Sequence, residues 1–206
     1  MKDEKYYEDN WKKEGTNTWR VYPGTFGRIA FFVGTNKKVL DVGCGVGILL
    51  NQLKHNGNDC MGVDISKTAI RKMRNTFNIV GECVEAPPLP FKKEQFDFVI
   101  ATEFFEHVDD EQQLIKECYR VCKTGGSIII AVPNDTLPPS KEPEHVRTYT
   151  KKALQDLLLM GVDDETANVF VEEYVEHFQP PGWKDTITGF PMTITLPTLL
   201  GRVVKR

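Results

Sequence analysis

The sequence predicts an α/β protein built on a doubly wound, mostly parallel sheet. Apolar runs of strand length recur along the chain, as in residues 39–42, 96–101 and 127–132, and predict strands that are buried on both faces. Segments with helical spacing of apolar residues alternate with these runs. A glycine-rich turn over residues 43–47 joins the first run to a helix. Strand, glycine turn and helix form the opening unit of a nucleotide-binding α/β fold.

The first predicted strand, residues 38–42, runs into Gly43, Gly45 and Gly47. Glycine lets the backbone turn sharply and approach a ligand closely, because no Cβ is in the way. The spacing is G-x-G-x-G, whereas the dinucleotide fingerprint is G-x-G-x-x-G. Asp41 lies on the strand just before the turn, where its carboxylate would repel a pyrophosphate and attract a cation. The turn therefore favours a positively charged ligand.

The string V-L-D-V-G-C-G-V-G, residues 39–47, resembles motif I of the class I S-adenosylmethionine-dependent methyltransferases. The similarity to the family continues in order to about Met160. Within the family, the chain is most similar to the small-molecule enzymes of the quinone-biosynthesis O-methyltransferase-like group. The resemblance implies a Rossmann-like fold with seven strands, an antiparallel last strand and S-adenosylmethionine as cofactor. It also implies that Asp41 and the three glycines bind the methionine end of that cofactor.

The second predicted strand, residues 59–64, ends in Asp64. Asp64 follows Gly47 at close to the spacing of about 20 residues at which an acid hydrogen-bonds the ribose hydroxyls. Ser66 is available to cap the following helix, residues 67–77, so Asp64 is not needed as the cap. We therefore predict that Asp64 binds ribose, and we place Ile65 in the same cofactor-binding set.

The third predicted strand, residues 79–86, leads into the proline-rich stretch 87–91. In the family that the chain resembles, an acid shortly before the string L-P-F accepts a hydrogen bond from the adenine amino group. Glu85 is the natural candidate for this role. The double proline changes the usual loop length, so Glu82 and Cys83 remain alternatives.

The fourth predicted strand, residues 96–101, is followed by Thr102, which we include among the cofactor-binding residues. His107 follows shortly after, at the carboxyl edge where open α/β sheets bind ligands. This position makes His107 the predicted general base, which would take the proton from the acceptor. His145 is the second choice for the base.

Glu103, Glu106, His107 and His145 also carry an alternative interpretation as a metal site. Two oxygens and two nitrogens suit Mg²⁺ or Mn²⁺, and the pattern E-x-x-E-H with a later histidine is similar to the metal site of small-RNA 3′-terminal 2′-O-methyltransferases. The same string occurs in metal-independent quinone-biosynthesis O-methyltransferases, so we predict that the site binds no metal. A net charge of −3 and the lack of a basic stripe argue against an RNA ligand.

The ends of the chain complete the predicted domain. Residues 1–35 are rich in aromatic side chains and form either a lid over the ligand or a helix packed on the sheet edge, ahead of a cofactor-binding domain over residues 36–206. Thr150 is predicted to cap a helix that runs to Met160. Strands over 168–178 and 192–196 would form the antiparallel hairpin that closes the sheet, and the tail over 199–206 would pack on the domain.

Composition narrows the class of protein. The 206 residues fit one domain. The cysteines are odd in number, scattered and without a C-x-x-C pair, which argues against both a disulfide framework and a zinc site. The polar N-terminus does not resemble a signal peptide, and no apolar run approaches the roughly 20 residues that span a bilayer. We therefore expect a cytoplasmic protein with a small-molecule partner and no nucleic acid.

Together these features predict methyl transfer from S-adenosylmethionine to a small-molecule acceptor, more at a hydroxyl oxygen than at nitrogen. One alternative is the metal-dependent RNA 2′-O-methyltransferase described above. Another is a nicotinamide-dependent oxidoreductase, which the glycine spacing and Asp41 disfavour. A third is a binding protein that keeps the cofactor pocket without catalysis.

Overall fold

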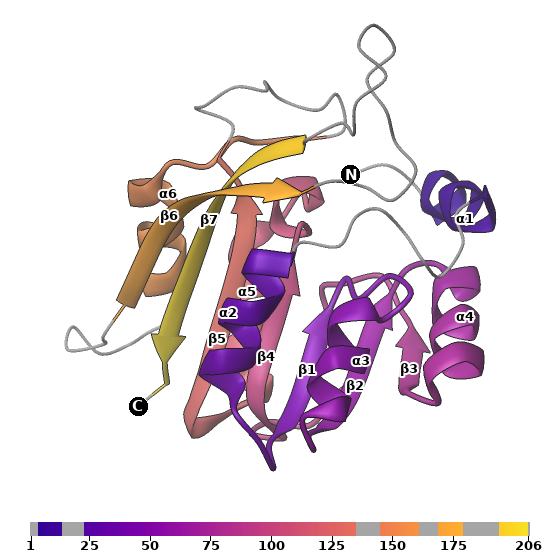
Figure 1. Cartoon of the computed structure of the whole chain (residues 1–206). Helices are drawn as coiled ribbons and strands as arrows, with labels where there is room; N and C mark the ends of the chain where they lie inside the picture. Colours follow the sequence, from indigo (N-terminus) through magenta and orange to yellow (C-terminus); the bar gives the residue numbers. More distant parts are fainter. Residues whose placement is uncertain (1–3, 14–22, 135–144, 161–168, 179–193, 206) are drawn as a thin grey trace, which may run out of the picture.

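The computed structural model describes residues 4–13, 23–134, 145–160, 169–178 and 194–205. Its strands form a seven-stranded sheet with helices on both faces (Figure 1). The strands are β1 Lys38–Val42, β2 Asp59–Asp64, β3 Val80–Cys83, β4 Phe96–Thr102, β5 Cys122–Pro133, β6 Val169–Phe178 and β7 Ile194–Val204. The helices are α1 Glu4–Lys13, α2 Pro23–Val33, α3 Ile48–His55, α4 Lys67–Phe77, the short 3₁₀ helix η1 Phe105–His107, α5 Glu111–Val121 and α6 Lys151–Leu159.

The strand order is β3-β2-β1-β4-β5-β7-β6. The five strands β1 to β5 pair in parallel, whereas β7 is antiparallel to both β5 and β6. This arrangement confirms the predicted mostly parallel seven-stranded sheet with an antiparallel last strand. The central strands are apolar because both of their faces are covered, and residues 39–42 of β1 are all buried.

Helices cover the two faces of the sheet in separate layers (Figure 1). On one face, Ile29 of α2, Leu50 of α3 and Met73 of α4 share a buried cluster. On the other face, Leu114 of α5 and Leu154 of α6 belong to the second cluster. Helices α3 to α6 each turn an apolar stripe to the sheet, as the sequence spacing predicts.

The chain reverses its direction of travel across the sheet between β1 and β4. It moves outward from β1 through β2 to β3, returns to the centre and then continues through β4 to β5. The loops at the carboxyl ends of β1 and β4 therefore diverge, and ligands of open α/β sheets bind in the crevice that results. The topology fixes where a site forms before any side chain is considered.

Local signals at helix ends behave as predicted. The Ser66 hydroxyl accepts a hydrogen bond from the backbone N–H of Ala69 at 3.2 Å, and Thr150 caps α6 in the same way through Ala153 at 3.1 Å. Each cap satisfies a backbone donor that the first turn of a helix leaves unpaired.

Three strand boundaries differ from the prediction by more than two residues. β3 ends at Cys83 instead of Ala86, because β2, its partner among the described strands, ends at Asp64. β5 begins at Cys122, ahead of the predicted residue 127, because Cys122 already pairs with the first residue of β4. β7 runs to Val204, so most of the predicted tail is a strand paired with β5.

Candidate active site

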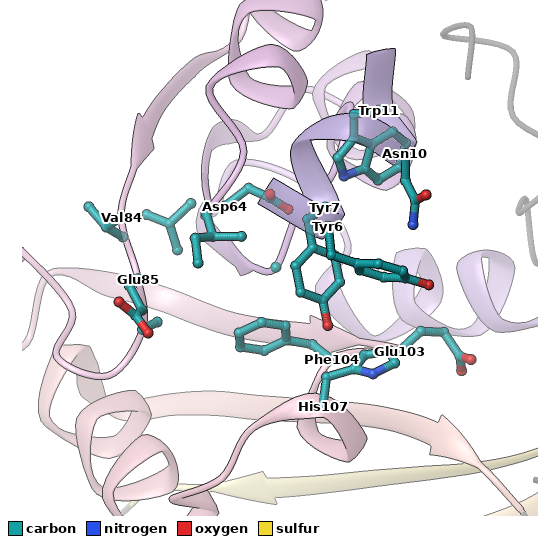
Figure 2. A pocket seen from close by; sticks show the side chains of 14 residues that line it. Tyr6, Tyr7, Asn10, Trp11, Asp64, Val84, Glu85, Glu103, Phe104 and His107 are labelled. Carbon is teal, nitrogen blue, oxygen red and sulfur yellow. The ribbon is translucent and has the colours of Figure 1, made fainter. Parts of the chain in front are cut away.

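One pocket lies at the carboxyl ends of the parallel strands, at the reversal point (Figure 2). Its wall is built by the loops that follow β1, β2, β3 and β4 and by helix α1. The lining residues are Tyr6, Tyr7, Asn10, Trp11, Gly43, Val63, Asp64, Ile65, Val84, Glu85, Ala86, Glu103, Phe104 and His107. Segments that are far apart in the sequence therefore converge on one cavity.

The glycine turn after β1 is packed so closely that side chains are excluded. Gly43 lines the pocket at φ 77°, and a Cβ there would lie 2.4 Å from the Phe104 ring. Gly45 has φ 52°, and its Cβ would lie 2.7 Å from the Trp11 ring. Both positions need glycine because the backbone is left-handed and the neighbouring rings leave no space. Gly45 and Gly47 shape the turn from outside the pocket lining.

Asp41 is a buried carboxylate near the end of β1, and it lies outside the pocket lining. Its Oδ1 atom has no hydrogen-bond partner among the described residues. Burial, and secondarily the charge of Asp64, raises the pKa of Asp41 well above its usual value. A buried carboxylate oxygen without a partner is costly unless a donor or a cation meets it. The residue therefore fits a cationic ligand bound at the glycine turn.

Asp64 points into the pocket from the end of β2 (Figure 2). Its Oδ2 accepts a hydrogen bond from the backbone N–H of Gly45, and its Oδ1 accepts one from the N–H of Ser66, both at 2.9 Å. Burial raises the pKa of Asp64 to about 6, against the opposing effect of these two bonds. The two backbone donors fix the carboxylate while leaving lone pairs for a ligand's hydroxyl groups.

The loop after β3 contributes Glu85 to the wall of the pocket, at the opposite end from Glu103 (Figure 2). Glu82 and Cys83, the alternatives to Glu85, lie outside the lining. The Cys83 thiol instead donates to the backbone oxygen of Ile65 at 3.2 Å, which ties this loop to the pocket residue Ile65. Of the three candidates, Glu85 alone is placed to contact a ligand in the pocket.

The loop after β4 turns through Glu103, a non-glycine residue with φ 51°. Left-handed backbone at such a residue costs on the order of 1–3 kcal/mol and is concentrated at functional sites. Glu103, Phe104 and His107 line the pocket beyond this turn, whereas Thr102, the last residue of β4, is half-buried outside the lining.

Helix α1 supplies pocket residues that the candidate set from the sequence does not include. Tyr6, Tyr7, Asn10 and Trp11 lie on one face of the helix, at the spacing i, i+1, i+4, i+5. Figure 2 shows Tyr7 projecting toward His107, and their ring centroids are 6.1 Å apart. The signal is present in the sequence as a one-sided aromatic face, but the sequence does not say what that face covers.

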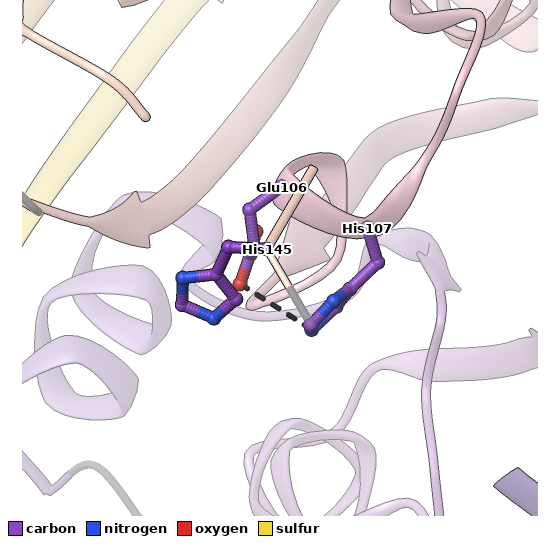
Figure 3. A group of neighbouring side chains, drawn as sticks. All are labelled: Glu106, His107 and His145. Atoms are coloured by element: carbon purple, nitrogen blue, oxygen red, sulfur yellow. Dashed lines mark ion pairs between the residues drawn. The ribbon is translucent and has the colours of Figure 1, made fainter. Parts of the chain in front are cut away.

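Glu106 and His145 lie beside the pocket residue His107 (Figure 3). Glu106 is fully buried, and His107 Nε2 lies 3.9 Å from its Oε1. The His107 and His145 ring centroids are 5.1 Å apart. One ligand atom from each residue lies within 4.8 Å of the others, and this donor set fits a divalent metal ion. Glu103, the fourth residue of the predicted metal set, lies outside the cluster.

Hydrogen bonds from the residues that follow His145 hold it beside Glu106 and His107. The Val146 N–H donates to the Glu106 backbone oxygen at 2.9 Å. The Arg147 guanidinium donates to the backbone oxygens of Phe105 at 3.0 Å, Asp109 at 2.9 Å and also Val108. Arg147 therefore joins the start of α6 to the 3₁₀ turn that holds the predicted base.

The pocket is negatively charged. Its lining, within the part of the chain that the structure describes, contains the carboxylates Asp64, Glu85 and Glu103 and no lysine or arginine. A pyrophosphate would be repelled by this arrangement, and a cationic ligand would be attracted.

Residues 40–130 match the protein family described as methyltransferase domain. This matched range runs from β1 into β5, and over it the chain is similar to a methyltransferase domain. Over 103 residues it is 36% identical to the ubiquinone biosynthesis O-methyltransferase of Coxiella burnetii, a match that covers 48% of this chain and 44% of that protein. The protein of the same name from Pseudomonas fluorescens is 34% identical over 104 residues, 48% of this chain and 45% of that one. The chain thus matches less than half the length of these curated relatives.

Solved structures support the α/β fold of the chain. YcgJ of Bacillus subtilis aligns with a TM-score of 0.70 at 17% identity, over 89% of this chain and 98% of that one. A protein of Thermotoga maritima, described as a SAM-dependent methyltransferase and possible histamine N-methyltransferase, aligns with a TM-score of 0.64 at 19% identity, over 90% of both chains. No helix in the described part of the domain is long and apolar enough to cross a membrane.

The predicted site residues divide into two groups. Five line the pocket, and they are Gly43, Asp64, Ile65, Glu85 and His107. Five lie outside its lining, and they are Asp41, Gly45, Gly47, Thr102 and His145. Asp41 is nevertheless buried and lies two residues before the lining residue Gly43. His145 is also buried, and its ring packs against that of the lining residue His107.

Proposed function

We propose that the domain transfers a methyl group from S-adenosylmethionine to a small-molecule acceptor, at a hydroxyl oxygen. The observation that carries this proposal is the chemistry of the pocket, which is acid-lined and lies above a glycine turn. Asp41, beside that turn, offers a buried carboxylate oxygen with no partner among the described residues. When bound, S-adenosylmethionine supplies a methyl group made electrophilic by its sulfonium.

The cofactor side of the pocket has residues suited to each part of the ligand. Asp41 and the glycine turn would hold the cationic methionine end. Asp64 would accept from the ribose hydroxyls, since its two backbone donors already fix its orientation. Glu85 would accept from the adenine amino group. These contacts orient the reacting carbon, and positioning is the main contribution that a protein makes to a displacement of this kind.

The acceptor side is formed by Glu103, Phe104, His107 and the aromatic face of α1. His107 would take the proton from the acceptor hydroxyl as the methyl group is transferred. The rings of Tyr6, Tyr7 and Trp11 would cover the reacting atoms and exclude water. His145 packs against His107 outside the lining, so its role as an alternative base would be indirect.

Oxygen is favoured as the accepting atom on two grounds. The curated relatives are named O-methyltransferases. A histidine in the pocket also suits a hydroxyl, which must lose a proton to become a good nucleophile. The nicotinamide alternative is disfavoured by the carboxylates of the lining.

A second candidate is a metal-assisted form of the same reaction, favoured by the cluster of Glu106, His107 and His145. A divalent ion held there would place positive charge beside the acceptor side of the pocket. Isothermal titration of the protein with Mn²⁺ and Zn²⁺ tests it, with His145→Ala as the comparison. Binding that the variant abolishes supports a metal, and no heat with either ion rejects it.

The proposed transfer is tested with isotopically labelled S-adenosylmethionine and a panel of small hydroxylated and amino compounds. We expect label in a hydroxylated product with the native protein and much less label with Asp64→Asn at the same concentration of S-adenosylmethionine. Label on amines alone would contradict O-methylation. Tight cofactor binding with no transfer to any compound would instead favour the non-catalytic binding protein.

A further inference from the structure

Helix α1 covers the pocket without an apolar anchor of its own. It supplies pocket residues at Tyr6, Tyr7, Asn10 and Trp11, yet none of its residues is buried. Its main packing partner among the described elements is α4 (Figure 1). A helix of this length gains little stability in isolation, and its half-buried side chains gain less from the hydrophobic effect than fully buried ones would. Specific polar contacts therefore contribute to its position.

Glu8 makes most of these contacts. Its Oε2 accepts from the Ser66 hydroxyl at 2.6 Å and from the Thr68 backbone N–H at 3.1 Å, while its Oε1 accepts from the Thr68 hydroxyl at 2.5 Å. Both partners lie at the N-terminus of α4, where unpaired N–H groups and the helix dipole favour a carboxylate. The hydrogen bond from Ser66, followed by that from Thr68, lowers the pKa of Glu8 to about 2.

A second attachment lies one turn further along α1. The Lys72 ammonium on α4 donates to the backbone oxygen of Trp11. This contact holds the end of α1 at which the Trp11 ring lies over Gly45. Helix α1 is therefore joined to α4 at two points on the same side of the pocket.

The contacts of α1 lead directly to Asp64. Ser66, whose hydroxyl donates to Glu8, also donates its backbone N–H to Asp64 Oδ1. Gly45, against which the Trp11 ring lies, donates its N–H to Asp64 Oδ2. Each of the two residues whose backbone N–H orients the Asp64 carboxylate therefore also contacts α1, Ser66 through its hydroxyl and Gly45 at its Cα.

We propose that Glu8 is a positioning residue for cofactor binding, which holds α1 over the pocket and, through Ser66, holds the Asp64 carboxylate in its binding orientation. The proposal rests on the proposed function for the identity of the ligand. It goes beyond that function because Glu8 lies outside the pocket lining and contacts the cofactor only through other residues. Closure of α1 and recognition of the ribose would then be coupled.

The test compares Glu8→Gln with Glu4→Gln. Glu4 is a matched control, since it is on the same helix, has an exposed side chain and among the described residues pairs only with Lys67, at 3.7 Å. Hydrogen exchange of the amides in residues 4–13 reports the position of α1 without ligand, and calorimetry with S-adenosylhomocysteine reports binding. We expect Glu8→Gln to exchange faster and to bind about tenfold more weakly, because a hydrogen-bonded carboxylate is lost. Glu4→Gln should match the native protein in both measurements.

Thr68→Val adds a readout that general destabilisation would not produce. It removes one donor to Glu8 and leaves the pocket lining intact. We expect Thr68→Val to weaken binding, and the double variant with Glu8→Gln to be no weaker than Glu8→Gln alone, because both remove the same contact. Additive losses would overturn the proposed contact.

The outcomes separate this inference from the proposed function. Native affinity in Glu8→Gln, with or without faster exchange of α1, overturns the positioning role. If the native protein itself binds no S-adenosylhomocysteine, the proposed function fails. In that case hydrogen exchange alone tests whether Glu8 attaches α1 to α4. Unchanged exchange of the α1 amides in Glu8→Gln would overturn that attachment.

Discussion

At the residue scale, the raised pKa of Asp64 predicts that ligand binding depends on pH. Burial raises its pKa to about 6, and the negative charge of Glu8 adds to this shift. Asp41 also interacts with it electrostatically. Above about pH 6 this raised pKa destabilises the fold in full, and the destabilisation disappears gradually as the pH falls from about 6 to the ordinary value of 3.8, where the unfolded chain is protonated as well. Above about pH 6 the carboxylate is ionised and accepts hydrogen bonds from hydroxyl groups most strongly.

We therefore expect the affinity for S-adenosylhomocysteine to fall as the pH is lowered from 8 through about 6. Calorimetry at several pH values measures this directly. Asp64→Asn should bind about tenfold to a hundredfold more weakly at pH 8, since a hydrogen bond to a charged group is lost. Its affinity should also depend less on pH. A native affinity that is constant from pH 5 to pH 8 would contradict the role of Asp64.

His107 is expected to act on the rate of transfer and not on cofactor binding. Removing a general base lowers kcat by about 10²- to 10⁴-fold. His107→Ala should show such a loss with the acceptor found in the transfer assay, while its Kd for S-adenosylhomocysteine stays at the native value. His55→Ala is the control, because His55 is exposed on α3 and bonds only to Asn51 among the described residues. Equal rates in His107→Ala and the native protein would remove His107 from the mechanism.

Gly45 has an unusual matched control in Gly57. Both have positive φ, 52° and 83°, but a Cβ at Gly57 meets nothing within 4 Å whereas one at Gly45 meets the Trp11 ring at 2.7 Å. Alanine at either position should cost about 1–2 kcal/mol from left-handed backbone strain. Gly45→Ala alone should also displace α1 and weaken cofactor binding. Chemical denaturation and calorimetry measure the two effects, and equal binding by both variants would contradict the contact.

At the scale of elements, the segment that begins at His145 illustrates how a long-range contact builds a site. Arg147 bonds the backbone around η1 and lies 3.4 Å from Glu111 at the start of α5. Tyr149, which follows it, donates to the same glutamate at 2.5 Å. These contacts place the start of α6 beside the loop that carries His107.

Arg147→Met should therefore destabilise the fold by about 2 kcal/mol, since several hydrogen bonds of roughly 1 kcal/mol each are lost. For a chain of this length that corresponds to a fall in Tm of about 4–8 °C. Arg74→Met is the control, because Arg74 makes one backbone bond in the described chain, to Gly81 at 3.2 Å. Calorimetric melting that shifts equally in the two variants would argue against a special role for Arg147.

Elements whose position depends on distant contacts were the hardest to predict. The glycine turn and Asp64 follow from local spacing and are found at one pocket. Glu8 and Trp11 of helix α1 bond to Ser66 and Lys72, which lie about sixty residues further along the chain, and no local pattern reveals these contacts. The choice among Glu82, Cys83 and Glu85 depended on where β3 ends, and that is set by its pairing with β2.

At the scale of the whole molecule, the sheet order determines what the domain can bind. The reversal between β1 and β4 brings the ends of four strands to one crevice, so residues from Gly43 to His107 line one cavity. The alternation of apolar runs and helical segments predicted the α/β class, whereas the seven strands and the antiparallel last strand were predicted from the resemblance to the methyltransferase family. The residues that form the proposed acceptor side were not predictable, because they depend on the position of α1 and on the packing of His145 against His107.

The central claim is that this acid-lined pocket at the reversal point binds a cationic adenosine derivative. Calorimetry of the native protein with S-adenosylmethionine and S-adenosylhomocysteine at pH 8 tests it most directly, with NAD as the comparison. We predict saturable one-to-one binding of S-adenosylmethionine and of S-adenosylhomocysteine, and no binding of NAD. Heat of binding with NAD alone, or with none of the three, would contradict it.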